Sequence, residues 1–185
     1  MRASSIFALL ALAALWATAL ALWPALPERV PMHFDLTGRA DRWVERSWLA
    51  WFVLPGLGTA MTLGFALALP RWIRRLAAEN SSYLNVPRKR DFARLAPDAR
   101  LRAIAPMLVL MRLIGAEVSL LFAAILFGSA RVASGEWERL PPALAFGSIA
   151  LVALTAFGSI PFGAASVRRE LELAGASKMR HSPSA

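Results

Sequence analysis

The fold of this chain is decided by stretches such as IAPMLVLMRLIGAEVSLLFAAILF, residues 104–127. This stretch is apolar on all sides and long enough for a helix that crosses a bilayer, which takes about 20 residues. Three further apolar runs lie at residues 5–23, 48–70 and 142–163. In hydrocarbon, backbone polar groups must be hydrogen-bonded within their own segment, so these runs predict four transmembrane helices. We expect an all-α integral membrane protein in which residues 1–185 form a single membrane domain.

The composition supports this class of protein. Apolar residues make up 57% of the chain, which is more than a soluble domain usually carries. Cysteine is absent, which excludes disulfides and thiolate metal sites. The net charge of +9 lies in the gaps between the apolar runs and is not interleaved with stacking aromatic residues. We therefore expect no nucleic-acid partner, and the charge is interpreted as a signal of membrane topology.

The distribution of lysine and arginine predicts the orientation of the helices. These residues are concentrated at 71–103 and in 164–185, and they are sparser at 24–47 and between the last two runs. Basic loops stay on the cytoplasmic side. Both termini are therefore expected in the cytoplasm, with the chain as a multi-pass membrane protein. Residues 24–47 then form a structured outer loop.

The first apolar run has an alternative interpretation as a cleaved signal peptide. Its basic region is Arg2 alone, and the small residues around Ala19 and Ala21 resemble a cleavage motif. The run is nevertheless long enough to span, and we interpret it as a retained helix. Cleavage would leave three spans, with residues 24–47 still outside.

Residues 71–103 form a basic inner loop. A helix is expected to continue from the second span along the inner surface as far as Asn80, and Pro97 is expected in the first turn of the next helix. The loop is interpreted as a solvated determinant of topology. Arg71, Arg74 and Arg75 are expected to lie among anionic lipid head groups of the bilayer, and the alternative to a topology determinant is a lipid-specific or regulatory site. Residues 164–185 are expected to form a short, mobile polar cytoplasmic tail, with His181 as a solvated surface residue.

Two charged residues, Arg112 and Glu117, lie inside the third span. Glu117 is about 20 Å along the helix from Ile104, near the middle of the bilayer, and a charge there is costly unless it is neutralised or paired. Five residues place the two side chains about 140° apart, so direct pairing is strained. A hydroxyl of another span is an equally good partner for Glu117, and the candidates are Thr59, Thr62, Ser148, Thr155 and Ser159. Glu117 is interpreted as a hydrogen-bonded packing element or as a proton, ion or ligand site.

Small residues recur at every fourth position of the second span, at Gly56, Ala60, Gly64 and Ala68. Such a stripe allows another helix to approach closely. It predicts either tight helix packing within the bundle or a homo-oligomer seam.

The outer loop carries the sequence LPERVPMHFDLTGRADRW, residues 26–43. Asp35 and Gly38 suit the first and fourth positions of a type I turn, and Ser47 suits a helix cap. Pro27 and Pro31 favour an extended approach to the turn.

His33, with Asp35 and Asp41, has two interpretations. In the first, His33 is bonded to the loop backbone or to a carboxylate, and in the second it belongs to a metal or ligand site. The spacing matches no known metal or catalytic motif, so we expect neither a metal nor a catalytic residue.

The loop resembles the signature of a bacterial membrane domain of unknown function 1648, a family that also forms the first half of SdpI-type immunity and signalling proteins. The matching positions are Pro27, Val30, Pro31, His33, Phe34, Gly38, Asp41 and Trp43. The inner-loop residues Asn85, Val86 and Pro87, followed by Asp91, Phe92 and Pro97, are similar to other members. The resemblance implies a small, multi-pass integral membrane protein of the bacterial inner (plasma) membrane.

These observations predict a non-enzymatic protein without a cofactor. It would act as a sensor, an immunity-like element or an accessory subunit, and its outer loop would meet a protein or peptide partner. One alternative is a transport component for protons, ions or small solutes that uses Glu117 and Arg112. A second alternative is a metal-dependent enzyme at the membrane surface, centred on His33.

Overall fold

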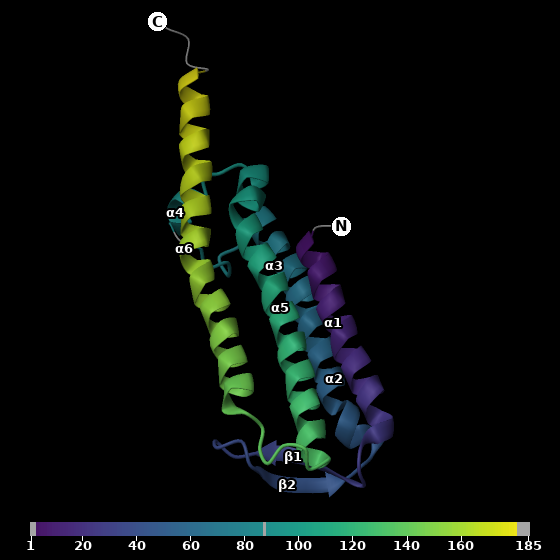
Figure 1. Ribbon diagram of the computed structural model, residues 1–185. Coiled ribbons are helices and arrows are strands. Elements are labelled where there is room, and N and C mark those ends of the chain that lie inside the picture. Colours follow the sequence, from purple (N-terminus) through teal and green to yellow (C-terminus); the bar gives the residue numbers. More distant parts are fainter. Residues whose placement is uncertain (1–2, 87, 181–185) are drawn as a thin grey trace, which may run out of the picture.

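The computed structural model describes residues 3–86 and 88–180 and shows a bundle of long helices with a two-stranded sheet at one end (Figure 1). Within the described residues, four helices are long and apolar enough to cross a membrane, which confirms this part of the prediction. The four spans contain the helices α1 (Ala3–Leu22), α2 (Trp48–Leu63), α5 (Pro97–Ala133) and α6 (Pro142–Arg180). Arg2, Pro87 and His181 lie outside the described residues.

Shorter elements connect and extend these helices. They are the 3-10 turn η1 (Trp23–Ala25), the strands β1 (Arg29–Phe34) and β2 (Ala40–Glu45), the π-helical turn η2 (Gly64–Ala68), and the helices α3 (Leu69–Ala78) and α4 (Lys89–Phe92). α2, η2 and α3 form one continuous helical segment. The two strands are antiparallel neighbours, so the predicted all-α architecture has a β-hairpin as its exception.

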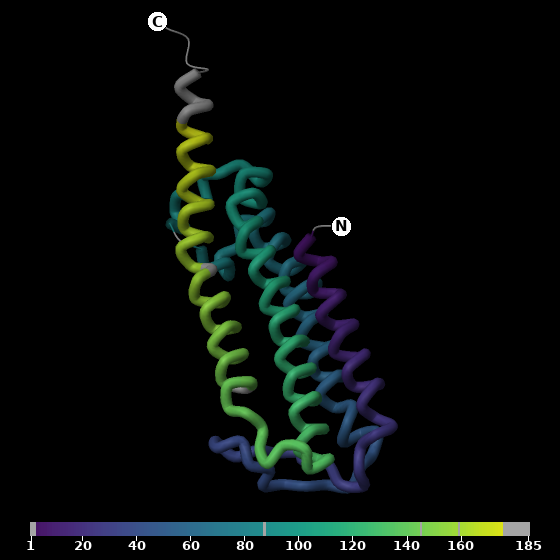
Figure 2. The backbone as a smooth tube through the Cα atoms, viewed as in Figure 1, coloured from purple at the N-terminus to yellow at the C-terminus, as the bar shows by residue number. Residues whose placement is uncertain are grey.

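α5 is the central helix of the bundle. It packs against α1, α2, α3 and α6, and its end near the sheet also contacts β1 (Figure 2). Near the hairpin the core joins Leu15 of α1, Val30 of β1, Trp51 of α2 and Leu126 of α5. The Trp51 indole donates a 2.9 Å hydrogen bond to the backbone oxygen of Ala19, which satisfies the buried N–H.

The helix ends follow the expected local signals. The Ser47 hydroxyl accepts a hydrogen bond from the Ala50 N–H at 3.2 Å, which makes Ser47 the cap of α2. Pro97 is the first residue of α5, where its missing N–H costs nothing. α3 ends before Asn80, which has a positive φ of 53°, and the N–H of Ser81 bonds to the Leu76 oxygen at 2.9 Å. This left-handed termination is common at the C-termini of helices.

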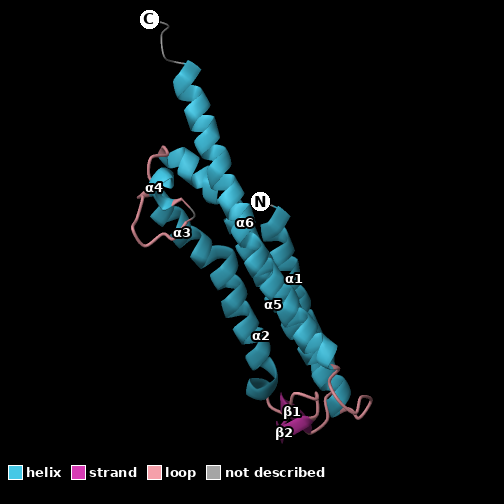
Figure 3. Ribbon diagram, turned by 90° about the vertical axis from the view of Figure 1, so that its left-hand side faces the viewer, coloured by secondary structure: helices cyan, strands magenta, loops and turns pink. Residues whose placement is uncertain are grey.

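The basic loop is a folded segment and not a wholly solvated one, and its role as a determinant of topology stays a prediction. Its apolar residues Leu84, Val86, Phe92 and Leu95 are buried against α3 and α5. Arg100 is also buried and donates to the backbone oxygens of Ala77 and Leu95, both at 3.1 Å. A cation at the C-terminus of α3 satisfies free carbonyls and complements the helix dipole. Figure 3 shows this folded segment around α4 at the opposite end from the hairpin.

The prediction of a short polar tail beginning at residue 164 is also wrong, because α6 continues to Arg180. Val167 is buried in the same cluster as the basic loop. Glu170 is nearly buried and pairs with Arg102 of α5 at 3.0 Å, and Arg168 pairs with Glu172 one turn further along. Arg168, Glu170 and Glu172, three of the charged residues that suggested a tail, therefore make ion pairs on a helix.

Candidate functional site

The hairpin is built around the turn from Asp35 to Gly38. The Gly38 N–H donates to the Asp35 backbone oxygen at 2.9 Å, as a β-turn requires, and Gly38 has a φ of +82°. The Asp35 carboxylate accepts hydrogen bonds from the Thr37 hydroxyl, the Thr37 N–H and the Arg39 N–H, at 2.7, 2.8 and 3.0 Å. The bond from the Thr37 hydroxyl, followed by that from the Arg39 N–H, lowers the pKa of Asp35. Asp35 thus stabilises the turn.

His33 and Asp41 form a pair across the two strands. Nδ1 of His33 lies 2.6 Å from Oδ1 of Asp41, and the side chains are 61% and 48% exposed. The register shifts around Met32, between the pairs of Pro31 with Trp43 and of His33 with Arg42. Such a bulge re-aims the side chains that follow it. The observed bond is the carboxylate contact that one interpretation of His33 expected.

The described residues contain no group of three or more His, Cys, Asp or Glu side chains that could hold a metal ion. His33 and Asp41 supply two such groups at an exposed position. The geometry therefore favours a role for this pair in fixing the two strands relative to each other.

A backbone contact ties the tip of the hairpin to the loop between α5 and α6. The Leu140 N–H donates to the Gly38 oxygen at 2.8 Å. A Cβ on Gly38 would lie 1.9 Å from the Leu140 oxygen, so the close approach requires glycine. Arg39 and Glu138 add an exposed ion pair at 3.3 Å. We call the contact of Gly38 with Leu140 the hairpin clasp.

The side chain of Leu140 also fixes the α5–α6 loop against α5. Its side chain is buried, and a Cβ on Gly128 of α5 would lie 2.2 Å from the Leu140 Cδ1 atom. Because Gly128 has no side chain, the space beside α5 is left for the side chain of Leu140. Sequence reasoning missed Gly128, Glu138 and Leu140, because their partners lie about 100 residues away in sequence or on another element, and no local pattern marks such contacts.

A cavity of about 360 Å³ lies between the hairpin and the helix ends. Its walls come from β1 and the turn, from α2, from α5 and from the start of α6. Most lining side chains are apolar, among them Met32, Phe34, Val53, Ile125 and Phe146, and the polar ones are those of His33, Asp35 and Ser129. We call this cavity the hairpin pocket.

The residues of the sequence motif line two different hollows at the hairpin. Pro31, His33, Phe34, Asp35 and Gly38 line the hairpin pocket, and Asp41 is joined to it through His33. Trp43 instead lines a separate shallow hollow together with Glu28 and Arg46, and Pro27 is partly buried at the approach to β1.

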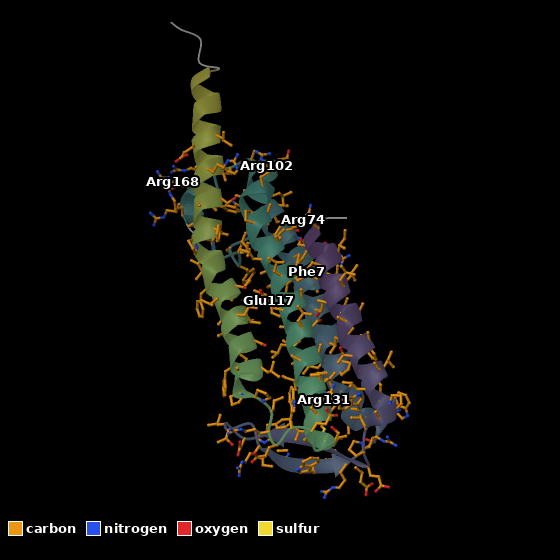
Figure 4. The ribbon with its side chains drawn as sticks, in the orientation of Figure 1. Phe7, Arg74, Arg102, Glu117, Arg131 and Arg168 are labelled. Carbon is orange, nitrogen blue, oxygen red and sulfur yellow. The ribbon has the colours of Figure 1, made fainter. Side chains whose placement is uncertain are left out.

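The charged residues of the third span lie within the bundle. Glu117 projects from the middle of α5 toward α6, about halfway between Arg102 and Arg131 (Figure 4). The Thr155 hydroxyl of α6 donates to Glu117 Oε1 at 2.7 Å, so one of the five candidate hydroxyls is its partner. Arg112 is buried, and its Nη1 donates to the Leu108 oxygen at 3.1 Å.

The predicted small-residue stripe does not mediate packing between helices of this chain. A Cβ on Gly56 or Gly64 would meet nothing within 4 Å. The packed face of this helical segment lies two residues further on, at Gly58, Thr62 and Ala66. The stripe therefore faces away from the bundle, and a homo-oligomer seam remains a prediction.

The fold and this site define a small helical membrane-type protein with a hairpin clasped over its helix ends. Residues 9–59 match the family described as Domain of unknown function (DUF1648). The match confirms the resemblance and covers most of α1, the whole hairpin and the first part of α2. The comparisons with curated proteins and with solved structures gave no match.

Proposed function

We propose that this chain is a non-enzymatic binding protein of the bacterial inner membrane that receives an apolar segment of a protein or peptide partner in the hairpin pocket. In this role it acts as a sensor, an immunity-like element or an accessory subunit. The observation that carries the proposal is the hairpin pocket itself. Its volume of about 360 Å³ lies within the usual range of ligand pockets, about 300–1,000 Å³, and its lining is mostly apolar with a few polar groups.

The orientation follows from the distribution of charge. The basic residues Arg74, Arg102 and Arg168 lie at the end opposite to the hairpin (Figure 4). The positive-inside rule then supports a cytoplasmic position for the folded basic loop, where anionic head groups are its natural neighbours. The hairpin pocket would open at the outer face, where a secreted or periplasmic partner can reach it.

The structure of the hairpin supports a binding function better than a catalytic one. The side chains of His33 and Asp41 are about half exposed, and among the described residues no third His, Asp or Glu side chain joins them in a group that could hold a metal ion. The apolar side chains under the hairpin, by contrast, offer a surface that gains free energy when an apolar group covers it.

The test is site-specific photocrosslinking in intact cells. A photoreactive amino acid at Met32, which lines the hairpin pocket, should capture a discrete partner. The substitution Ala50→Trp fills the pocket and should abolish this product. Leu49→Trp is the matched control, because Leu49 is 82% exposed and lies next to Ala50 outside the pocket lining.

The amount of protein in the membrane is measured for each variant, so that loss of insertion is not mistaken for loss of binding. A crosslinked product that survives Ala50→Trp as well as it survives Leu49→Trp would refute the proposed pocket.

A further inference from the structure

A small hollow lies between α3 and α5 at the end of the bundle opposite to the hairpin. Its volume is about 140 Å³, and it is lined by Arg74 of α3 and by Leu101, Arg102, Ala105 and Leu108 of α5. α3 packs against α5, and Figure 4 shows Arg74 and Arg102 at this end of the molecule. Two cations from different elements therefore border one cavity, which we call the arginine hollow.

Both arginines lie at the depth of lipid head groups when the bundle spans a bilayer. Arg74 is about 39 Å along its continuous helical segment from Trp48, and Arg102 is about 44 Å along α5 from Arg131. A bilayer measures about 40–45 Å when its head groups are included. Trp72 of α3 is exposed at the same level, and indole rings prefer this interface.

The two guanidinium groups have donors to spare. The side chain of Arg74 is exposed and forms no ion pair or hydrogen bond with a described residue. Arg102 contacts Oε2 of Glu170 through Nε at 3.1 Å and Nη2 at 3.0 Å. This pair holds Arg102 in place and leaves its Nη1 donors unused by the described residues. Because Glu170 offsets the charge of Arg102, the net positive charge of the hollow comes from Arg74.

The rest of the arginine hollow is apolar and extends toward the hydrocarbon. Leu101, Ala105 and Leu108 are spaced at i, i+4 and i+7, so they form one face of α5. Leu108 lies about 9 Å along α5 from Arg102, toward the middle of the span. Positive charge at head-group level with apolar surface deeper in the bilayer matches the two parts of an anionic phospholipid.

We propose that the arginine hollow binds one anionic phospholipid, from the inner leaflet in the proposed orientation. Its phosphate accepts hydrogen bonds from Arg74 and from Nη1 of Arg102, and an acyl chain covers the apolar face of α5. The planar fork of a guanidinium group matches the geometry of phosphate oxygens. The ammonium group of a zwitterionic lipid would meet a net positive charge, so an anionic head group is favoured.

The bound lipid would bridge α3 and α5, the two helices that the folded basic loop connects. The proposal does not depend on what the hairpin pocket binds. Its first test is native mass spectrometry of the full chain in detergent, titrated with phosphatidylglycerol or phosphatidylcholine. Phosphatidylglycerol should saturate one site at concentrations where phosphatidylcholine does not bind. Equal binding of the two lipids would overturn the proposal, as would displacement of phosphatidylglycerol by an equal concentration of inorganic phosphate.

Matched variants separate a site from general attraction between opposite charges. Arg74→Gln should weaken binding of phosphatidylglycerol about tenfold or more, because hydrogen bonds to a charged group are lost. Arg75→Gln removes the same charge from the same helix, but Arg75 pairs with Glu79 and lies outside the hollow, so its effect should be much smaller. Ala105→Trp fills the hollow without changing the charge and should also abolish binding. Equal losses in Arg74→Gln and Arg75→Gln would overturn the proposal.

Photocrosslinking in vesicles shows where the lipid lies. Phosphatidylglycerol with a diazirine in one acyl chain should label residues 101–108 of α5. It should also label α6 at Leu154 and Phe157, which are exposed apolar residues and report unselective contact with lipid. Excess unlabelled phosphatidylglycerol should remove the label from α5 more than from α6, and excess phosphatidylcholine should not. Absence of label from residues 101–108, or equal competition at both helices, would overturn the proposal.

Discussion

Substitution of Gly38 by alanine tests how the hairpin is attached to the rest of the protein. The new Cβ would lie 1.9 Å from the Leu140 oxygen, whereas contacts under 3.0 Å are essentially never found. The α5–α6 loop must therefore move away, and the 2.8 Å bond from the Leu140 N–H to the Gly38 oxygen is lost.

The expected cost follows from two contributions. A non-glycine residue in the left-handed region costs about 1–2 kcal/mol, and the lost hydrogen bond costs about 1 kcal/mol. Gly38→Ala should thus lower the free energy of unfolding by about 2–3 kcal/mol. Gly135→Ala is a matched control, because Gly135 also has a positive φ, +75°, but open space beside it. It should cost only the strain, about 1–2 kcal/mol.

Two assays measure these effects. Unfolding in mixed micelles gives the free energy of each variant relative to the parent chain. In the second assay, Arg39 and Glu138, which form an ion pair at 3.3 Å in the parent chain, are replaced by cysteine. Cross-linking of these cysteines by a bifunctional maleimide reports whether the tip of the hairpin still contacts the α5–α6 loop. Gly38→Ala should lose most of this cross-link and Gly135→Ala should keep it. Equal stability and equal cross-linking in the two variants would refute the hairpin clasp.

Three further substitutions test other parts of the structure. Trp51→Phe removes the buried bond to the Ala19 oxygen and should lower the free energy of unfolding by about 1–2 kcal/mol, measured in the same micelle assay. Arg100→Met removes two bonds that join the basic loop to the end of α3, and should increase cleavage by added protease within residues 79–96, with membrane insertion unchanged. The lowered pKa of Asp35 means that its contribution to the turn is complete above its ordinary value of 3.8, and is lost only as the pH falls through the lower value of the folded protein. Protection of the hairpin amides from hydrogen exchange should decrease over this acid range in the parent chain. In Asp35→Asn it should not change with pH over the same range.

The long-range architecture was predictable because it depends on bulk properties of the chain. Four apolar runs predicted four helices, since both the length needed to cross hydrocarbon and the demand for internal hydrogen bonds act on whole segments. Ser47 and Pro97 were predictable for a similar reason, because caps and first turns depend on a few adjacent residues. The turn at Gly38 belongs to the same group of local signals.

The parts that were missed depend on contacts between distant residues. The alternation that marks a strand is interrupted at β1, where Pro31 and the bulge at Met32 disturb the pattern. Burial of Arg100 could not be inferred from its charge, because the two carbonyls that satisfy it come from different segments. The small-residue stripe could not be assigned to packing within the bundle or to an oligomer seam from the sequence, since glycine and alanine at every fourth position do not show which side of a helix meets a neighbour in the same chain.

The boundary of the family match runs through the hairpin pocket. Residues 9–59 supply the hairpin and the α2 wall, whereas Ile125, Ser129 and Phe146 come from the later part of the chain. The pocket that we propose as a binding site thus combines walls from inside and outside the matched segment. Substitutions at the ends of α5 and α6 would change the shape of the pocket without altering any residue of that segment.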